Sequence, residues 1–462
     1  MRVSNAEGAT LVWFRQDLRL SDNPALHAAA TRGMPVIPVY VWSPSDEGDW
    51  PLGGASRWWL HESLRALDTD LRNRGLRLIL ARGPTVQALT DLATRCSASA
   101  LYWNRRYEPA AVRCSRLVAR TLRAASLQTI EFNASLLTDP AQTLNASGAP
   151  YQVYTAFRNK VQQTLTPGRL LPVPPHLSAP RRWPVGATLA QLELLPRVRW
   201  YESLAAVWKP GEATARAALR RFLAQRSADY PRTRDRPAVR GTSRLSPHLH
   251  FGEIGPRQVW RAFKADGGRD ATFLHELLWR EFAYHLLHHF PHTAREPLRA
   301  RFRRFPWHRD SRKLRAWQRG MTGLPLVDAG MRELWSTGWM HNRVRMVTAS
   351  FLVKNLLIPW QQGAQWFWDT LVDADLANNS LNWQWVAGCG ADAAPYFRIF
   401  NPNSQAQRFD PGGQYIDNWI PELRGGTRTR YPHPIVDLQA TREAALRAYK
   451  SIGRASGDRG RL

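Results

Sequence analysis

Tryptophan is the most unusual component of this 462-residue chain, which contains 21 of them. Most buried indoles only fill a core, but an indole face can also stack on a nucleobase or a flavin. A row of indoles can further pass an electron deficit from an excited oxidant outward to solvent. The tryptophans of the C-terminal half are Trp260, Trp279, Trp307, Trp317, Trp335, Trp339, Trp360, Trp366, Trp368, Trp383, Trp385 and Trp419.

Residues 241–246 read GTSRLS, which places three hydroxyls and one guanidinium within six residues. At the start of a helix, such groups and the free N–H groups form an anion site. Without further context, Ser246 before Pro247 is equally a plain helix cap. Both interpretations stay open from the residues alone.

Carboxylates and amides crowd a second segment, at Asp373, Asp375, Asn378 and Asn379. They could hold a cation, a sugar hydroxyl or a ring N–H, although a polar turn that ends a helix is the plainer alternative. Histidines at i,i+4 spacing, as in zinc enzymes, occur at His285, His288, His289 and His292. The HExxH pattern and CxxC pairs are absent, so we predict no metal site.

The charge balance indicates a polyanionic partner. Lys and Arg total 64 against 37 Asp and Glu, a net charge of +27, and most of the cations are Arg, which forks onto phosphate oxygens. A GC-rich genome would explain the preference for Arg but not the shortage of acids. We therefore predict nucleic-acid binding. No apolar run reaches the roughly 20 residues of a membrane helix, and no signal peptide is visible, so a cytoplasmic protein without a membrane partner is expected.

The elements that must position these groups fall into two classes. Short apolar runs predict strands at 10–14, 36–42, 76–81, 99–103 and 129–132, separated by helical patterns such as 56–74. This alternation predicts a Rossmann-like α/β domain with a parallel sheet, although no GxGxxG loop follows the first strand. Later helical patterns, without strands, predict an all-α domain; they lie at 212–225, 273–289, 325–336, 342–357 and 363–371.

Prolines break the stretch between these two parts, which carries one predicted helix near 151–165. We therefore expect an α/β domain at 1–134, an interdomain connection at 135–205, an all-helical domain at 206–440 and a basic tail at 441–462.

The order of several long motifs resembles the photolyase/cryptochrome family. These are LVWFRQDLRLSDNPAL at 11–26, LLWREFAYHLL at 277–287, STGWMHNRVRMVTASFLVK at 336–354, DADLANNSLNWQW at 373–385 and DAAPYFRIFNP at 392–402. The resemblance covers about residues 10–425. GGASRWWLHESL at 53–64 and WNRRYEP at 103–109 are similar to the bacterial class III branch.

The resemblance implies light-driven repair of cyclobutane pyrimidine dimers in UV-damaged DNA, by electron transfer from reduced FAD to a flipped dimer. The implied FAD ligands are Tyr230, Thr242, Ser243, Arg244, Leu245, Ser246, Arg280, Asp373 and Asp375. Asn379 matches the position that faces flavin N5, where a neutral amide favours the reduced anion. Plant cryptochromes carry Asp there, which favours repair over signalling in this chain.

The resemblance also assigns the lesion pocket to Glu276, Trp279, Asn342, Met346 and Trp385. Photolyases for (6-4) lesions place a His where Asn342 stands, so the cyclobutane lesion is favoured. The implied electron-transfer row consists of Trp383, Trp360 and Trp307. Further DNA contacts are implied at Arg234, Arg343 and Gln405.

Two departures from the family pattern bear on the cofactors. Phe273 stands where many members place Trp at the flavin. The folate-contacting Asn-Glu pair is missing after Tyr107-Glu108. The expected antenna is 5,10-methenyltetrahydrofolate on subgroup grounds, with a deazaflavin, or none, as alternatives. A cryptochrome-type blue-light receptor and a (6-4) photolyase stay as alternative functions, and a monomer is expected.

Overall fold

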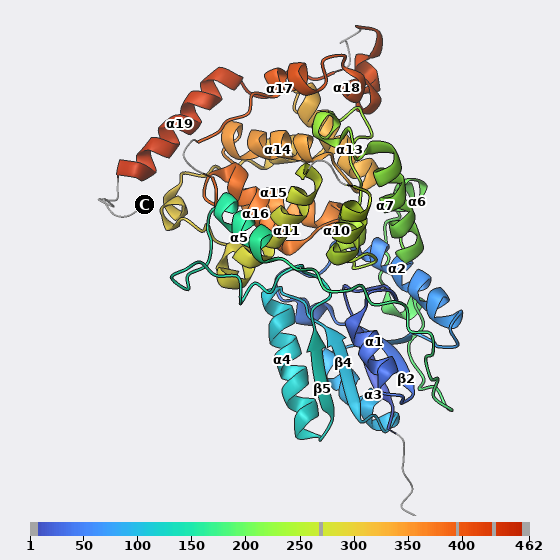
Figure 1. The fold of residues 1–462 in the computed structure, drawn as a ribbon. Coiled ribbons are helices and arrows are strands. Elements are labelled where there is room, and N and C mark those ends of the chain that lie inside the picture. The colour runs from blue at the N-terminus through green and yellow to red at the C-terminus, as the bar shows by residue number, and fades with distance from the viewer. Residues whose placement is uncertain (1–7, 268–270, 394–396, 427–430, 455–462) are drawn as a thin grey trace, which may run out of the picture. The chain divides into compact units, whose positions relative to one another are not determined.

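The computed structural model describes residues 8–267, 271–393, 397–426 and 431–454. Figure 1 draws their helices and strands. These residues divide between two compact units. Unit 1 comprises Met1–Thr143, Val161–Ser227 and Ser243–Leu277, and unit 2 comprises Leu144–Lys160, Ala228–Thr242 and Leu278–Leu462. Because these stretches alternate along the chain, the predicted boundaries at 134, 205 and 440 stay a prediction from the sequence.

Unit 1 contains a five-stranded parallel sheet with the order β3-β2-β1-β4-β5. Its strands are β1 (Thr10–Phe14), β2 (Val36–Trp42), β3 (Ile79–Arg82), β4 (Ala100–Asn104) and β5 (Gln128–Phe132). The predicted parallel sheet is confirmed. The strand predicted from residue 76 begins later because the Leu76 N–H still bonds the Leu71 carbonyl at the end of the preceding helix.

Both faces of this sheet are buried, as its near-continuous apolar strands require. One face packs alternate strand residues such as Leu11, Val39 and Leu101 with Leu89 and Val118 of the helices. The helices between the strands are α1 (Pro24–Thr31), α2 (Gly54–Arg72), α3 (Thr85–Arg95) and α4 (Pro109–Ala124). Because the strand order reverses after β3, right-handed crossovers place α1 and α3 on opposite faces.

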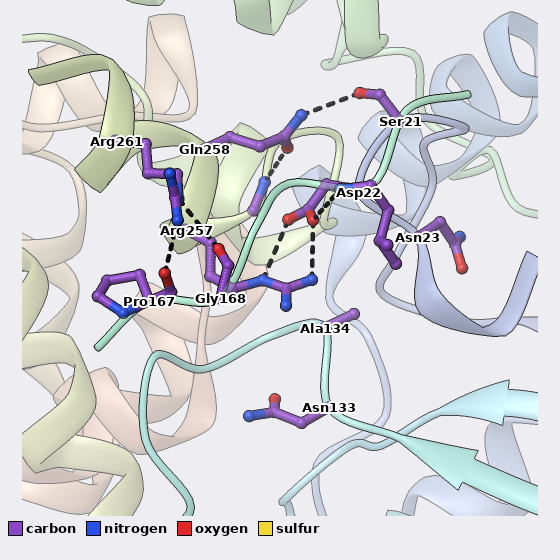
Figure 2. A network of polar contacts seen from close by, with 12 residues as sticks. Ser21, Asp22, Asn23, Asn133, Ala134, Pro167, Gly168, Arg257, Gln258 and Arg261 are labelled. Atoms are coloured by element: carbon purple, nitrogen blue, oxygen red, sulfur yellow. Dashed lines mark hydrogen bonds and ion pairs between the residues drawn. The ribbon is translucent and has the colours of Figure 1, made fainter. Parts of the chain in front are cut away.

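Unit 1 also contains α6 (Glu202–Val207), α7 (Glu212–Arg226), α9 (Ser246–His250) and α10 (Pro256–Ala265). Figure 2 shows how α10 is tied to the loop after β1: Arg257 donates to both carboxylate oxygens of Asp22, at 2.8 and 3.2 Å. Arg261 donates to the carbonyls of Pro167 and Gly168, which lie in the proline-rich stretch. The opening motif at 11–26 thus connects the loop after β1 to α10 within unit 1.

Unit 2 is helical in its described residues, as predicted. Its helices are α8 (Tyr230–Thr233), α12 (Ser311–Gln318), α13 (Pro325–Thr337), α14 (Asn342–Ser350), α15 (Trp360–Thr370), α16 (Leu376–Ala387), α17 (Pro402–Phe409), α18 (Gln414–Trp419) and α19 (Leu438–Arg454). Two helices, α5 (Tyr154–Thr164) and α11 (Thr272–His289), contain residues of both units. No helix in the described residues is long and apolar enough to cross a membrane.

One sequence prediction in unit 2 needs correction, and one helix was not predicted. The helix predicted over 342–357 ends as an α-helix at Ser350 and continues as a π-helical turn over Phe351–Asn355. The helix α19, which was not predicted, extends from Leu438 into the predicted basic tail as far as Arg454. Its buried face consists of Ala445, Ala448 and Ile452, which lie at helical spacing. Because two of them are alanines among many basic residues, the apolar periodicity that indicates a helix is weak here. Residues 455–462 lie outside the described part.

Candidate active site

Two buried carboxylates in unit 2 have fixed partners. Asp375 is the N-cap of α16 and accepts hydrogen bonds from the backbone and side-chain nitrogens of Asn378, at 2.8 and 2.9 Å. The Tyr284 hydroxyl donates to its other oxygen. Asp373 accepts two bonds from Arg345, at 2.9 and 3.1 Å. The polar turn therefore begins a helix rather than ending one, and it presents two oriented carboxylates.

Asn379 lies one turn into α16 and is half-buried. Its side-chain Nδ2 donates to the Ala364 carbonyl of α15 at 3.1 Å. This bond fixes which end of the amide faces α15. A neutral amide oriented in this way suits a polar edge of a ring cofactor.

The hydroxyl-rich segment runs from Thr242, the last residue of a unit 2 stretch, to Ser246, the first residue of α9 in unit 1. Arg244 has a left-handed backbone, with φ of 54°, and its guanidinium lies over the Trp208 ring at 5.0 Å. The Ser243 hydroxyl accepts from the Leu245 N–H at 3.4 Å. Leu245 is buried and Ser246 is exposed. The hydroxyls and the guanidinium are the donors that a diphosphate requires.

The two remaining predicted FAD ligands, Arg280 and Tyr230, are in unit 2. Arg280 is 9% exposed, lies over the Tyr284 ring at 4.9 Å and approaches Glu281 at 3.6 Å. Tyr230, the first residue of α8, is buried beneath the guanidinium of Arg234 at 5.4 Å. The groups among the predicted ligands, which are hydroxyls, cations and carboxylates, fit the phosphate, sugar and ring groups of a dinucleotide.

Helices α11 and α14 present the predicted lesion residues. Glu276 and Trp279 lie one turn apart on α11, so they occupy the same face of that helix. Asn342 and Met346 are likewise one turn apart at the start of α14, where Asn342 is exposed. Trp385 is half-buried on α16, with Arg398 over its ring at 5.2 Å. All except Glu276 belong to unit 2.

Two of the predicted DNA contacts come together in unit 2. Arg343 pairs with Asp235 at 2.9 Å and lies over the Phe409 ring at 4.4 Å. Arg234 directly precedes the Asp235 that pairs with Arg343, so Arg234 and Arg343 lie close together. Gln405 is one turn before Phe409 on α17.

Of the three predicted electron-transfer tryptophans, two are buried and one is half-buried. Trp383 and Trp360 are 2% and 1% exposed, and Trp307 is half-buried. Helix α15 packs closely on the Trp383 ring of α16, because a Cβ at Gly363 would lie 2.1 Å from Cη2 of Trp383. Trp307 lies against Phe305 at 4.4 Å. This difference in burial is what a path from the interior to solvent requires.

The clustered histidines are used in packing. The His285 Nε2 accepts a hydrogen bond from the Tyr151 N–H at 3.0 Å, and the rings of His285 and His288 lie 4.6 and 4.9 Å from that of His289. Within the described ranges, no group of three or more His, Cys, Asp or Glu side chains is placed to hold a metal ion.

Unit 1 has a pocket of its own at the carboxyl ends of β1 and β2, the edge at which open α/β sheets bind ligands. Aromatic rings of Trp13, Tyr40 and Trp42 line it, together with the Arg106–Glu47 ion pair, whose two bonds measure 2.7 and 2.9 Å. None of these residues was among those predicted from the sequence to form a site.

Sequence reasoning missed several side chains that hold the predicted ones in place. They are Arg345 on Asp373, Tyr284 on Asp375, Trp208 under Arg244, Arg398 over Trp385 and Tyr154 against Trp279. Three of them, Tyr284, Arg345 and Arg398, lie inside the motifs quoted above. The motifs therefore contain these residues, but a motif does not show which side chains contact each other.

Comparisons with known proteins identify the family of this chain. A family model for DNA photolyase matches residues 10–178, and one for the FAD binding domain of DNA photolyase matches residues 273–429. A deoxyribodipyrimidine photo-lyase of Agrobacterium fabrum is 44% identical over 96% of this chain and 98% of its own length. Cryptochrome-1 of Arabidopsis thaliana is 37% identical over 90% of this chain and 63% of its own length.

A solved bacterial class III photolyase from Agrobacterium tumefaciens is similar in fold. It matches with a TM-score of 0.93 and 43% identity over 98% of this chain and 100% of that one. The two family models, the photo-lyase relative that matches over nearly its whole length and the class III photolyase structure lead to one conclusion: the chain belongs to the photolyase/cryptochrome family of FAD-binding proteins.

Proposed function

We propose that this protein is a deoxyribodipyrimidine photolyase that repairs cyclobutane pyrimidine dimers in DNA under light. The observation that carries the proposal is the near full-length similarity to a relative with that name, at 44% identity, combined with Asn342 at the exposed start of α14. A neutral amide there lacks the acid that the (6-4) reaction uses.

Bound FAD supplies the light-absorbing electron donor. The residues of the chain would hold and orient it: Asp373 and Asp375 would bind its polar groups, Asn379 would serve its central ring, and Thr242 to Ser246 with Arg280 would bind its phosphates. The buried carboxylates are held by Arg345 and Tyr284, so they need little reorganisation when the cofactor binds.

Damaged DNA is expected to dock through phosphates on Arg234 and Arg343, which makes affinity fall steeply with salt. The dimer stacks poorly in the duplex, which lowers the cost of flipping it by a few kcal/mol. Trp279 and Trp385 then stack on the flipped dimer, while Glu276 hydrogen-bonds its pyrimidine edge. Trp307, Trp360 and Trp383 would carry electrons from solvent toward the flavin and so would supply the reduced state that repair needs.

A photoreceptor of the cryptochrome type is the second candidate function. The Arabidopsis relative supports it through 37% identity over 63% of its own length. Asn379, at the position of the cryptochrome Asp, favours repair.

An antenna chromophore completes the proposal, with 5,10-methenyltetrahydrofolate ahead of a deazaflavin. The pocket of unit 1 lined by Trp13, Tyr40 and Trp42 is our candidate site for its flat ring system. Acid extraction of the purified protein and mass spectrometry identify the chromophore, and Trp42→Ala should release an antenna from this pocket while FAD is retained. A cytoplasmic monomer stays the expectation, to be checked by light scattering.

The decisive experiment illuminates the reduced holoprotein with DNA that carries one cyclobutane dimer and, separately, one (6-4) product. We expect repair of the first substrate only. Repair of the (6-4) product would overturn the choice of lesion, and repair of neither by flavin-loaded protein would favour the receptor function.

A further inference from the structure

Trp279, one of the two predicted stacking platforms, already has a stacking partner within the protein. The ring centroids of Tyr154 and Trp279 lie 3.5 Å apart, and their planes are inclined by only 9°. This separation is ordinary stacking contact, so no base fits between the two rings. One face of Trp279 is therefore taken, and only the opposite face can receive a pyrimidine.

Tyr154 is held firmly in this position. It is 6% exposed at the start of α5, and its ring lies edge-on to Phe282, 5.9 Å away. Phe282 is fully buried and also meets Trp279 edge-on at 5.9 Å. Phe157, one turn after Tyr154, packs on Phe282 at 5.2 Å. The ring behind Trp279 thus belongs to a packed aromatic core, whereas Trp279 itself is half-buried.

This arrangement has a physical consequence for recognition. A half-buried indole without support would lose rotamer freedom when a base stacks on it, and that loss weakens binding. With Tyr154 behind it, the indole plane is set before DNA arrives. The benefit applies only to a flipped base, because phosphate contacts do not depend on the indole plane.

We propose that Tyr154 is a positioning residue for lesion recognition, which backs Trp279 so that its opposite face stacks on the flipped pyrimidine dimer. The inference rests on the proposed repair function. It assigns a role in specificity to the segment before residue 205 that was expected to be only a connection.

The test compares affinities of FAD-loaded variants for DNA with one cyclobutane dimer and for the same undamaged duplex, measured in the dark by fluorescence anisotropy. Tyr154→Leu should weaken binding of the damaged duplex about tenfold, at the lower end of the cost of losing one base–aromatic stack. Binding of the undamaged duplex and its salt dependence should not change. Tyr154→Phe keeps the ring and should restore the wild-type ratio.

Tyr151→Leu is the matched control, because Tyr151 lies in the same segment and packs on Phe157 and His285. It should leave the affinity ratio unchanged. If Tyr154→Leu does not fold, Tyr154→Met fills the space without a planar ring and gives the same comparison. In a Trp279→Ala background, Tyr154→Leu should have no further effect on the ratio.

The two hypotheses fail in different ways. A wild-type protein that binds both duplexes equally would overturn the repair function itself. A wild-type preference for the lesion that survives in Tyr154→Leu, or an equal loss on both duplexes, would overturn the role of Tyr154 alone.

Discussion

A single nitrogen of Arg345 lies 2.9 and 3.1 Å from the two carboxylate oxygens of Asp373, which is only 8% exposed. Removing one partner of such a pair leaves a poorly solvated charge. We expect Arg345→Gln to weaken FAD binding about tenfold or more, the effect of losing one charged hydrogen bond. Equilibrium dialysis of FAD checks this. Arg447→Gln, at an exposed position of α19, is the control and should bind FAD normally.

A second prediction concerns Gly363. A methyl group there would overlap Trp383 and come within 2.6 Å of Leu352, so the indole must move. Gly363→Ala should lower the free energy of unfolding by about 1–3 kcal/mol, as overpacking does, and slow light-driven reduction of oxidised FAD. Thermal unfolding and absorption under illumination measure the two effects. Gly412→Ala, whose Cβ meets nothing closer than 3.7 Å, should change neither.

Trp307 is the half-buried end of the predicted row. Trp307→Phe should block photoreduction of oxidised FAD but spare repair by chemically reduced enzyme, because only the first process draws electrons through the row. Flash photolysis and a dimer-repair assay separate the two. Trp419→Phe, outside the row, should behave as wild type in both assays. Normal photoreduction in Trp307→Phe would remove the row from the mechanism.

Glu276 is predicted to bind the pyrimidine edge. Glu276→Ala should lower repair per absorbed photon while FAD stays bound, and should weaken binding of damaged DNA by roughly ten- to a hundredfold through loss of one charged hydrogen bond. Glu443→Ala on α19 is the control. An unchanged photon yield and affinity in Glu276→Ala would remove this residue from the lesion pocket.

His341 predicts an acid-sensitive contribution to stability. Burial lowers its pKa from 6.5 to about 4, although Asp235 opposes the shift; Arg345 and Arg343 add to it. The unfolded chain therefore takes up a proton before the folded one, so stability is lost as pH falls from 6.5 toward 4, by up to about 3 kcal/mol.

His341→Asn keeps an acceptor for the Arg343 N–H that Nδ1 now serves, and it does not titrate. Its thermal midpoint should fall less than that of the wild type between pH 7 and pH 5. An equal fall in both proteins would show that His341 does not set this sensitivity.

The fold was more accessible from sequence than the contacts of the site. Buried strands such as β1 and β2 are continuous apolar runs, so their bounds were predicted correctly. The helix α19 was missed because its buried face uses alanines, which occur as often on surfaces. Pairings such as Tyr154 with Trp279 join residues 125 positions apart, and no local spacing encodes them.

The small side chains that hold α19 have a further consequence. Ala445 and Ala448 bury little more than a methyl group each. The helix is therefore also held by larger side chains of its own, such as Tyr449, whose ring is stacked on Phe397 at 4.4 Å. Elements with so little buried apolar area open locally before the rest of a protein unfolds. Hydrogen exchange should accordingly begin in this helix. Its transient release would expose Phe302 and Phe397, an apolar surface that promotes aggregation during storage at high concentration.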